Sequence, residues 1–192
     1  MKKLQLLLVL LVVMVLLALS DYVVTQPNFN LPSQTPAVTD SSPITSKTQT
    51  KEIIEKHPEL SDYHLEKTVR STNLFEHFNI SGLNLESYKN TLTNNSLPPI
   101  IVYEIKAPRN QGKFTFLSLK LELSKQISPG ADLNVTNQFG QSSLFYNDQN
   151  TPSTGFLLVQ LRDTIVGFQY AKASPESFDY IKTFVQVLNT IS

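Results

Sequence analysis

The sequence predicts an α+β protein: an antiparallel β-sheet packed by a C-terminal amphipathic helix and by N-terminal helices, preceded by one transmembrane or signal helix and a disordered linker. Three observations predict this class. Residues 4–24 are almost entirely apolar. Apolar and polar residues alternate along several segments after Pro98, which is the period of a strand. Apolar residues recur at helical spacing from Phe178 to Ile191.

The N-terminal stretch enters a lipid bilayer in either of two forms. Residues 4–24 are about long enough to span a hydrocarbon core of ~30 Å as an uncleaved anchor. The same stretch also has the features of a signal peptide, which would be cleaved after Ser20. We expect the anchor. In both cases Lys2 and Lys3 stay in the cytoplasm by the positive-inside rule, and residues 25–192 are exported.

Composition narrows the class of the exported part. The 192 residues hold 16 basic and 16 acidic side chains, so no net charge attracts nucleic acid over a distance. The chain has no cysteine, which excludes a lipoprotein anchor and favours a domain of a bacterial-type cell envelope held together by packing alone. Three N-x-S/T triplets begin at Asn79, Asn94 and Asn134, but such triplets arise readily by chance in a chain rich in these residue types.

Residues 25–50 form the predicted linker. They are rich in Pro, Ser, Thr and Gln and contain no Gly, so they cannot bury enough apolar surface to offset the entropy cost of ordering. Their prolines favour an extended polyproline II conformation, which indicates a semi-rigid spacer. The folded extracytoplasmic domain is then expected over residues 51–192.

The first part of this domain carries helical signals. Residues 51–57 predict a short helix that Pro58 ends, and residues 59–67 predict another. Leu85, Tyr88 and Leu92 follow helical spacing and predict a helix over residues 85–93, capped by Asn84.

After Pro98 the period changes to that of strands. Residues 100–105 are β-branched and aromatic, which predicts a strand. Over residues 113–127 four leucines alternate with Ser, Lys and Glu, which predicts a strand with one dry and one wet face. Residues 133–139 and 143–146 predict weaker strands.

Residues 155–170 predict a β-hairpin whose two-residue turn is Arg162-Asp163. This register pairs Leu161 with Thr164, Val159 with Val166 and Leu157 with Phe168, and it places all three pairs on one face. The agreement between register and apolar pattern supports the hairpin.

The last element is a helix with Ser174 as its N-cap and Pro175 as its first residue. Its apolar stripe consists of Phe178, Ile181, Phe184, Val185, Leu188 and Ile191, and we expect it to pack on the leucine face of the 113–127 strand. The order of strand, Pro-containing turn and helix over residues 156–191 resembles the end of PsbP/Mog1-like domains. That resemblance implies an α/β/α sandwich around an antiparallel sheet and an extrinsic, mostly non-enzymatic module. No functional residue of the family can be matched.

No catalytic, cofactor or metal site is predicted. His57, His64 and His77 do not have metal-ligand spacing, and solvent exposure explains them best. Ser81, Ser142 and Ser143 lack the context of a nucleophile and are expected in turns.

A possible catalytic carboxylate pair and a possible calcium loop are also better explained by structural roles. Glu104 and Glu122 lie on strands that are expected to be neighbours, but adjacent lysines indicate a solvated charged face rather than a catalytic pair. Residues 147–150 carry oxygen ligands for calcium, yet they lack the pattern of an EF-hand and are expected to be a hairpin loop.

Phe114 and Phe116 are expected together on the sheet face opposite the leucines, either covered by N-terminal helices or forming a patch for a ligand or partner. We therefore expect a membrane-anchored, extracytoplasmic, non-catalytic binding or assembly module. A hydrolase acting on envelope polymers would need a polar cleft joining His64 or His77 to a carboxylate. A small-ligand carrier would need a closed apolar cavity between sheet and helix.

Overall fold

The structure is a computed structural model, and it describes residues 49–127 and 131–191. All of these residues belong to one compact unit, Asp40–Ser192. The predicted span 4–24 and almost all of the predicted linker lie outside the described residues. Across the two described ranges, no helix is long and apolar enough to cross a membrane.

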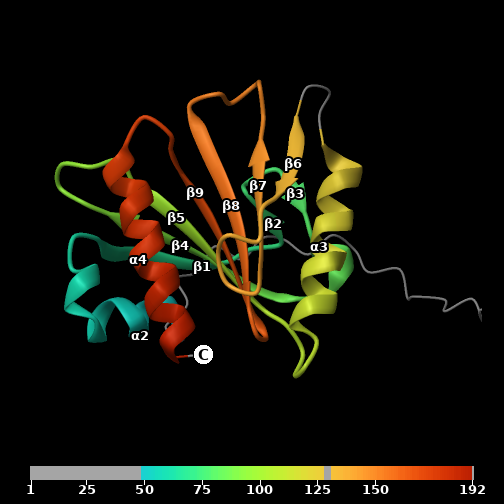
Figure 1. Ribbon diagram of the computed structural model, residues 1–192, viewed down its shortest axis with the longest axis horizontal. Coiled ribbons are helices and arrows are strands. Elements are labelled where there is room, and N and C mark those ends of the chain that lie inside the picture. Colours follow the sequence, from blue (N-terminus) through green and yellow to red (C-terminus); the bar gives the residue numbers. More distant parts are fainter. Residues whose placement is uncertain (1–48, 128–130, 192) are drawn as a thin grey trace, which may run out of the picture. The chain divides into compact units, whose positions relative to one another are not determined.

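An antiparallel sheet of seven strands forms the centre of this unit, so the predicted α+β class is confirmed (Figure 1). The strand order is β1-β4-β5-β9-β8-β7-β6, and every neighbouring pair is antiparallel. The strands are β1 (His64–Arg70), β4 (Glu86–Thr93), β5 (Ile100–Lys106), β6 (Asp132–Val135), β7 (Ser142–Asn147), β8 (Thr154–Leu161) and β9 (Thr164–Ala171).

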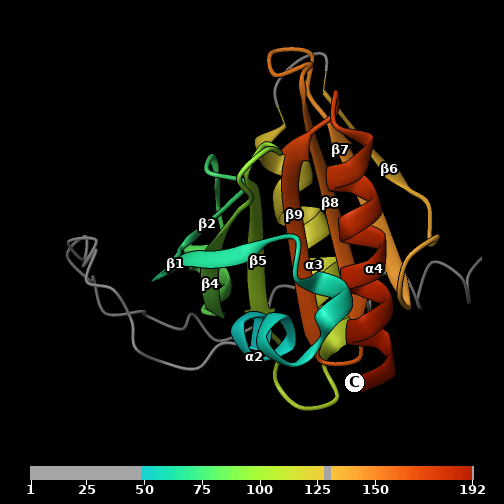
Figure 2. The same ribbon diagram turned by 90° about the vertical axis from the view of Figure 1, so that its left-hand side faces the viewer.

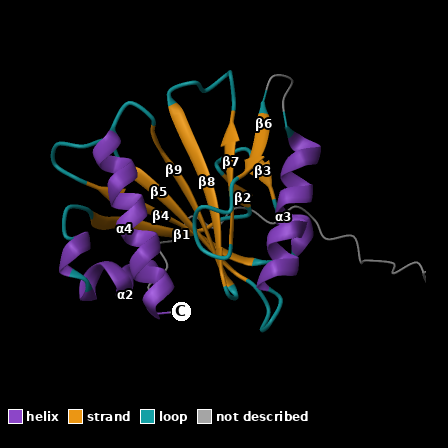
Figure 3. Ribbon diagram, in the orientation of Figure 1, coloured by secondary structure: helices purple, strands orange, loops and turns teal. Residues whose placement is uncertain are grey.

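Helices cover both faces of the sheet (Figures 1 and 2). On one face lie α4 (Pro175–Ile191), α2 (Gln49–Lys56) and the 3-10 turn η1 (Pro58–Leu60), around one apolar core. On the other face lie α3 (Gly112–Gln126) and the small hairpin of β2 (Asn73–Leu74) and β3 (Phe78–Asn79), around a second core. A further 3-10 turn, η2 (Ser81–Leu83), follows the hairpin. Figure 3 shows these layers by secondary structure.

The central strands supply both cores because successive side chains point to opposite faces. Leu157 and Val159 of β8 face the α4 core, whereas Phe156 and Leu158 face the α3 core. A strand buried on both sides needs apolar residues at nearly every position, and β8 has them.

The hairpin prediction over residues 155–170 is confirmed in detail. Leu161 pairs with Thr164, Val159 with Val166 and Leu157 with Phe168, as the apolar pattern required. The two turn residues lie between β8 and β9, and Arg162 has φ +51°, the left-handed conformation that such a tight turn imposes.

The C-terminal helix is also confirmed. α4 begins at Pro175, and the Ser174 hydroxyl accepts the backbone N–H of Ser177 at 3.4 Å. Ile181, Phe184, Val185 and Leu188 are buried against the sheet. The end of the predicted stripe differs, because Ile191 is 49% exposed.

The strand predicted over residues 113–127 is wrong: this segment is the helix α3. Leu119 and Leu123 are fully buried, but Leu117 is 51% and Leu121 59% exposed, so the leucines do not share one face. Leu, Lys, Glu and Gln make up nine of the 15 residues of α3 and are strong helix formers, whereas Thr115 is its one β-branched residue. This propensity overrides the alternation. The prediction that α4 packs on a leucine strand fails for the same reason.

The helix predicted over residues 85–93 is wrong too, because this segment is the strand β4. Tyr88, Asn90 and Leu92 are its buried residues at alternating positions, and the polar Asn90 hid this period in the sequence. Residues 59–67 are not an α-helix either; they contain the end of η1 and the start of β1.

Four other predicted elements are confirmed. α2 and β5 match the helix and strand predicted there, although α2 begins at Gln49, before the expected start of the domain. β6 and β7 occupy the two weaker strand segments. The N-terminal helices were expected on the other side or end of the sheet from the C-terminal helix. Instead, α2 lies on the same face as α4, since Ile53 of α2 and Leu60 of η1 join the same core as α4.

Candidate functional site

The outward face of α3 is the most apolar exposed feature that the described residues show. Phe114 is 70% exposed, Leu117 51% and Leu121 59%. At 100° per residue these three side chains share one face, directly opposite the buried Phe116, Leu119 and Leu123. We call Phe114, Leu117 and Leu121 the outer ridge.

The N-terminus of α3 is fixed by the β8–β9 turn. The carboxylate of Asp163 accepts the backbone N–H of Asn110 at 2.8 Å and that of Gly112 at 3.1 Å. Gly112 is required here, since a Cβ atom on this residue would overlap the carbonyl oxygen of Arg162. The helix is therefore held in place by a cap that lies about fifty residues later in the chain.

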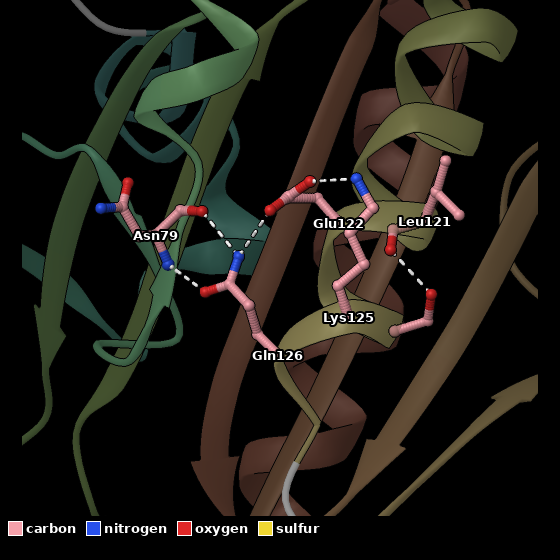
Figure 4. Close-up of polar contacts among 6 residues, drawn as sticks. Asn79, Leu121, Glu122, Lys125 and Gln126 are labelled. Carbon is pink, nitrogen blue, oxygen red and sulfur yellow. Dashed lines mark hydrogen bonds and ion pairs between the residues drawn. The ribbon is translucent and has the colours of Figure 1, made fainter.

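The C-terminal end of α3 is tied to the β2–β3 hairpin. The Gln126 side chain accepts the backbone N–H of Asn79 and donates to its carbonyl oxygen, both at 2.9 Å. Gln126 also donates to Glu122, whose pKa is lowered chiefly by the hydrogen bond from Lys125 and also by this one. Figure 4 shows that Leu121 lies away from the contacts between Gln126 and Asn79.

A shallow groove of about 150 Å³ runs beside the ridge. It is lined by Leu83, Leu85, Pro108, Gln111, Phe114, Thr115 and Ser118. The groove lies at the surface between α3 and η2, and thus differs from the enclosed cavity between sheet and helix that a small-ligand carrier needs. No histidine or carboxylate is among these lining residues, so the groove is not the polar cleft that was expected of a hydrolase.

Basic residues border the ridge. Lys113, Lys120 and Lys125 are the basic residues of α3, and Glu122 is its one acidic residue. Lys125 forms an ion pair with Glu122 at 3.1 Å. Lys113 and Lys120 have no ion pair among the described residues, so the surroundings of the ridge carry a net positive charge.

Sequence and structure comparisons add no assignment. No family model, curated protein or solved structure matches this chain. The resemblance of residues 156–191 to PsbP/Mog1-like domains therefore stays a prediction.

Of the two aromatic residues predicted to share a sheet face, only Phe114 is exposed. Phe116 is 3% exposed and belongs to the α3 core. The sequence signal for the ridge was present, because helical spacing separates Phe114 from Phe116 and groups it with Leu117 and Leu121. The strand interpretation hid it.

The predicted charged face with Glu104 and Glu122 is a second correction. Glu104, on the central strand β5, is 1% exposed. Its carboxylate accepts the backbone N–H groups of Gln49 and Thr50 at 3.2 and 3.1 Å and the Thr50 hydroxyl at 3.0 Å. Glu104 thus caps α2, and Glu122 lies on α3 rather than on a neighbouring strand.

The three histidines are not brought together. Nδ1 of His57 lies 3.3 Å from a Glu59 carboxylate oxygen, and Nε2 of His64 lies 2.9 Å from the Thr93 hydroxyl. The His77 ring packs on Phe78, with 4.7 Å between centroids. No group of three or more potential metal ligands of the His, Cys, Asp or Glu type occurs in the described ranges.

The remaining polar candidates have structural roles. Ser143 is fully buried, and its hydroxyl accepts the backbone N–H of Phe139 at 3.1 Å. Asn147 is the last residue of β7, and residues 148–150 lie in the loop between β7 and β8, as predicted. There Asp148 accepts the N–H of Asn150 and the Tyr146 hydroxyl, at 2.8 and 3.0 Å, and these bonds lower the pKa of its carboxyl.

Proposed function

We infer that this protein is a non-catalytic binding module of a cell envelope, held at a membrane by residues 4–24 and spaced from it by the linker. The observation that carries this inference is the outer ridge. Large apolar side chains that stand together on a well-fixed helix mark a contact surface more often than chance exposure. The N-terminus is cytoplasmic and the domain is extracytoplasmic.

The way α3 is held supports a contact role. Asp163 fixes one end of the helix and Gln126 the other, while Phe116, Leu119 and Leu123 anchor its inner face. The ridge is therefore presented in one orientation before anything binds, which lowers the entropy cost of contact. An exposed apolar ridge with no contact to make would be a solubility liability for the domain.

Single-cysteine labelling tests this function in the intact protein, because the chain has no native cysteine. Leu117→Cys is exposed to a membrane-impermeant maleimide in intact cells and again after solubilisation in detergent. Lys172→Cys, at an exposed site after β9, is the matched control. We expect slow labelling of L117C in cells and fast labelling in detergent, with fast labelling of K172C in both.

Two results would contradict the proposal. Equal labelling rates for L117C and K172C in cells would mean that nothing covers the ridge. Labelling of neither residue until the cells are opened would mean that the domain is cytoplasmic. Carbonate extraction with intact-mass analysis tests the anchor separately, since a soluble product that begins at Asp21 would show a cleaved signal peptide.

A further inference from the structure

We propose that the outer ridge of α3 rests on the anionic surface of the same bilayer that residues 4–24 are proposed to span. This inference rests on the proposed function and names the partner of its contact surface. The domain would then lie against the membrane through Phe114, Leu117 and Leu121, with α4 on the opposite, outward side.

The first argument is the distribution of apolar residues around α3. Its inner face fills the core shared with Tyr103, Phe156 and Ile165. Its outer face is apolar as well, and a helix that is apolar on both sides needs a second nonpolar environment. In a sheet protein with helices on both faces, an outer helix normally presents polar residues there, so the ridge is not explained by the fold.

The second argument is the size of the ridge. Phe114 to Leu121 covers only about 10 Å of helix at ~1.5 Å per residue. A stable interface with another protein or a second copy of this chain needs ~800 Å² from each partner, supplied by ~20–30 residues. An interfacial helix needs only to immerse an apolar face by ~5–10 Å, which three large side chains can do.

The third argument is charge. Three lysines of α3 border the ridge, whereas α3 has one acidic residue, Glu122. The lysines are Lys113, Lys120 and Lys125. Lysine beside an exposed apolar helix face is the pattern of helices that lie in the interface, where the ammonium groups contact lipid phosphates while the apolar side chains enter the acyl region. An acidic or uncharged border would have argued for a different partner.

The fourth argument is the place where the preceding chain joins the domain. The Gln49 side-chain oxygen accepts the Thr164 hydroxyl at 3.3 Å. The neighbouring Asp163 caps the start of α3. The chain therefore enters the domain at the same end of the sheet from which α3 begins.

The length of the spacer fits this arrangement. Residues 25–48 would reach at most ~75 Å as polyproline II and ~27 Å on average as a flexible coil. Either reach keeps the ridge within contact distance of the bilayer at a high effective concentration, so a weak intrinsic affinity is enough.

Depth-dependent quenching tests the proposal on the full chain. The protein has no Trp, so Phe114→Trp supplies a single tryptophan in the ridge, which can be excited selectively over the seven tyrosines. Ile191→Trp supplies the matched control, because Ile191 is also exposed but lies on α4 in the opposite layer. Each variant is reconstituted into vesicles of phosphatidylcholine and phosphatidylglycerol that contain lipids brominated near the headgroup.

If the ridge is immersed by ~5–10 Å, the indole of the F114W variant reaches the brominated lipid carbons, and we expect its fluorescence to be quenched about twofold more than that of the I191W variant. Adding Leu117→Ser and Leu121→Ser should remove the difference, and ~0.5 M salt should reduce it by screening the lysines. Both serine changes replace exposed side chains, so the fold should persist, and circular dichroism checks this.

The experiment separates a failure of the membrane anchor from a failure of bilayer contact by the ridge. A protein that does not float with the vesicles refutes the anchor and hence the proposed function. A protein that floats but shows equal quenching in both variants refutes bilayer contact and leaves the anchor intact. A blue-shifted emission of the F114W variant without quenching would show that another protein surface or a second copy covers the ridge, and it would overturn the lipid assignment.

Discussion

Replacing Gly112 by Ala tests the junction between α3 and the β8–β9 turn. Gly112 is the first residue of α3, and helix propensity alone predicts that Ala stabilises the helix by up to ~1 kcal/mol. The structure predicts the opposite sign. The added Cβ would overlap the carbonyl oxygen of Arg162, so either the turn or the helix must move.

The magnitude follows from what such a movement disturbs. Overpacking in a close contact costs about 1–3 kcal/mol, and weakening the Asp163 cap costs about 1 kcal/mol more. After the gain in propensity, the net loss in the free energy of unfolding is about 1–3 kcal/mol. For a domain of this size that lowers Tm by roughly 3–10 °C.

Gly82→Ala is the matched control, because a Cβ atom there would meet nothing within 4 Å. Thermal unfolding of both variants, followed by far-UV circular dichroism in a mild detergent, gives the comparison. We expect the Tm of G82A to stay close to that of the wild type. A Tm of G112A equal to or above the wild-type value would refute the close contact and with it the described placement of α3.

Two further predictions concern buried polar groups. Glu104→Gln should lower the free energy of unfolding by about 1.5–3 kcal/mol, because an amide N–H₂ would face the N–H and hydroxyl donors at the start of α2. Glu122→Gln on the surface should leave the free energy of unfolding nearly unchanged. Urea titrations compare the two variants. Burial, with the Asp148 carboxylate, raises the pKa of Tyr146 to about 12, and burial also raises the pKa values of Tyr103 and Tyr180. The protonated phenols therefore stabilise the fold fully below pH ~10, and this stability falls as the pH rises toward ~12 and beyond. Phenolate absorbance should lag behind that of free tyrosine until the fold is lost, and a titration at ordinary pKa with the fold intact would contradict this.

The sequence predicted elements whose determinants are local. The 155–170 hairpin was predicted correctly because the two-residue turn and the apolar period demand the same register. α4 was predicted because a cap, Pro175 and a periodic stripe all coincide within one segment. In both cases residues that are close together in the sequence determine the element.

The errors occur where distant residues decide the structure. Residues 112–126 satisfy a strand period and a helix period at once, so periodicity alone could not decide between them, and the carboxylate that caps the helix start, Asp163, is far along the chain. Glu104 was placed in solvent because Lys106 is its neighbour in sequence, whereas its actual partners are the N–H groups of α2. The outer ridge was missed as a helix face for the same reason, since a face can be assigned only after the period is known.

The strand order has a consequence for the timing of folding. β1, β4 and β5 are made early and form one half of the sheet, while β6, β7 and β8 form the other half. β9 is the strand that joins the halves, and it is followed only by α4. A nascent chain that lacks roughly the last thirty residues holds two unjoined half-sheets, so cooperative folding waits until synthesis is almost complete.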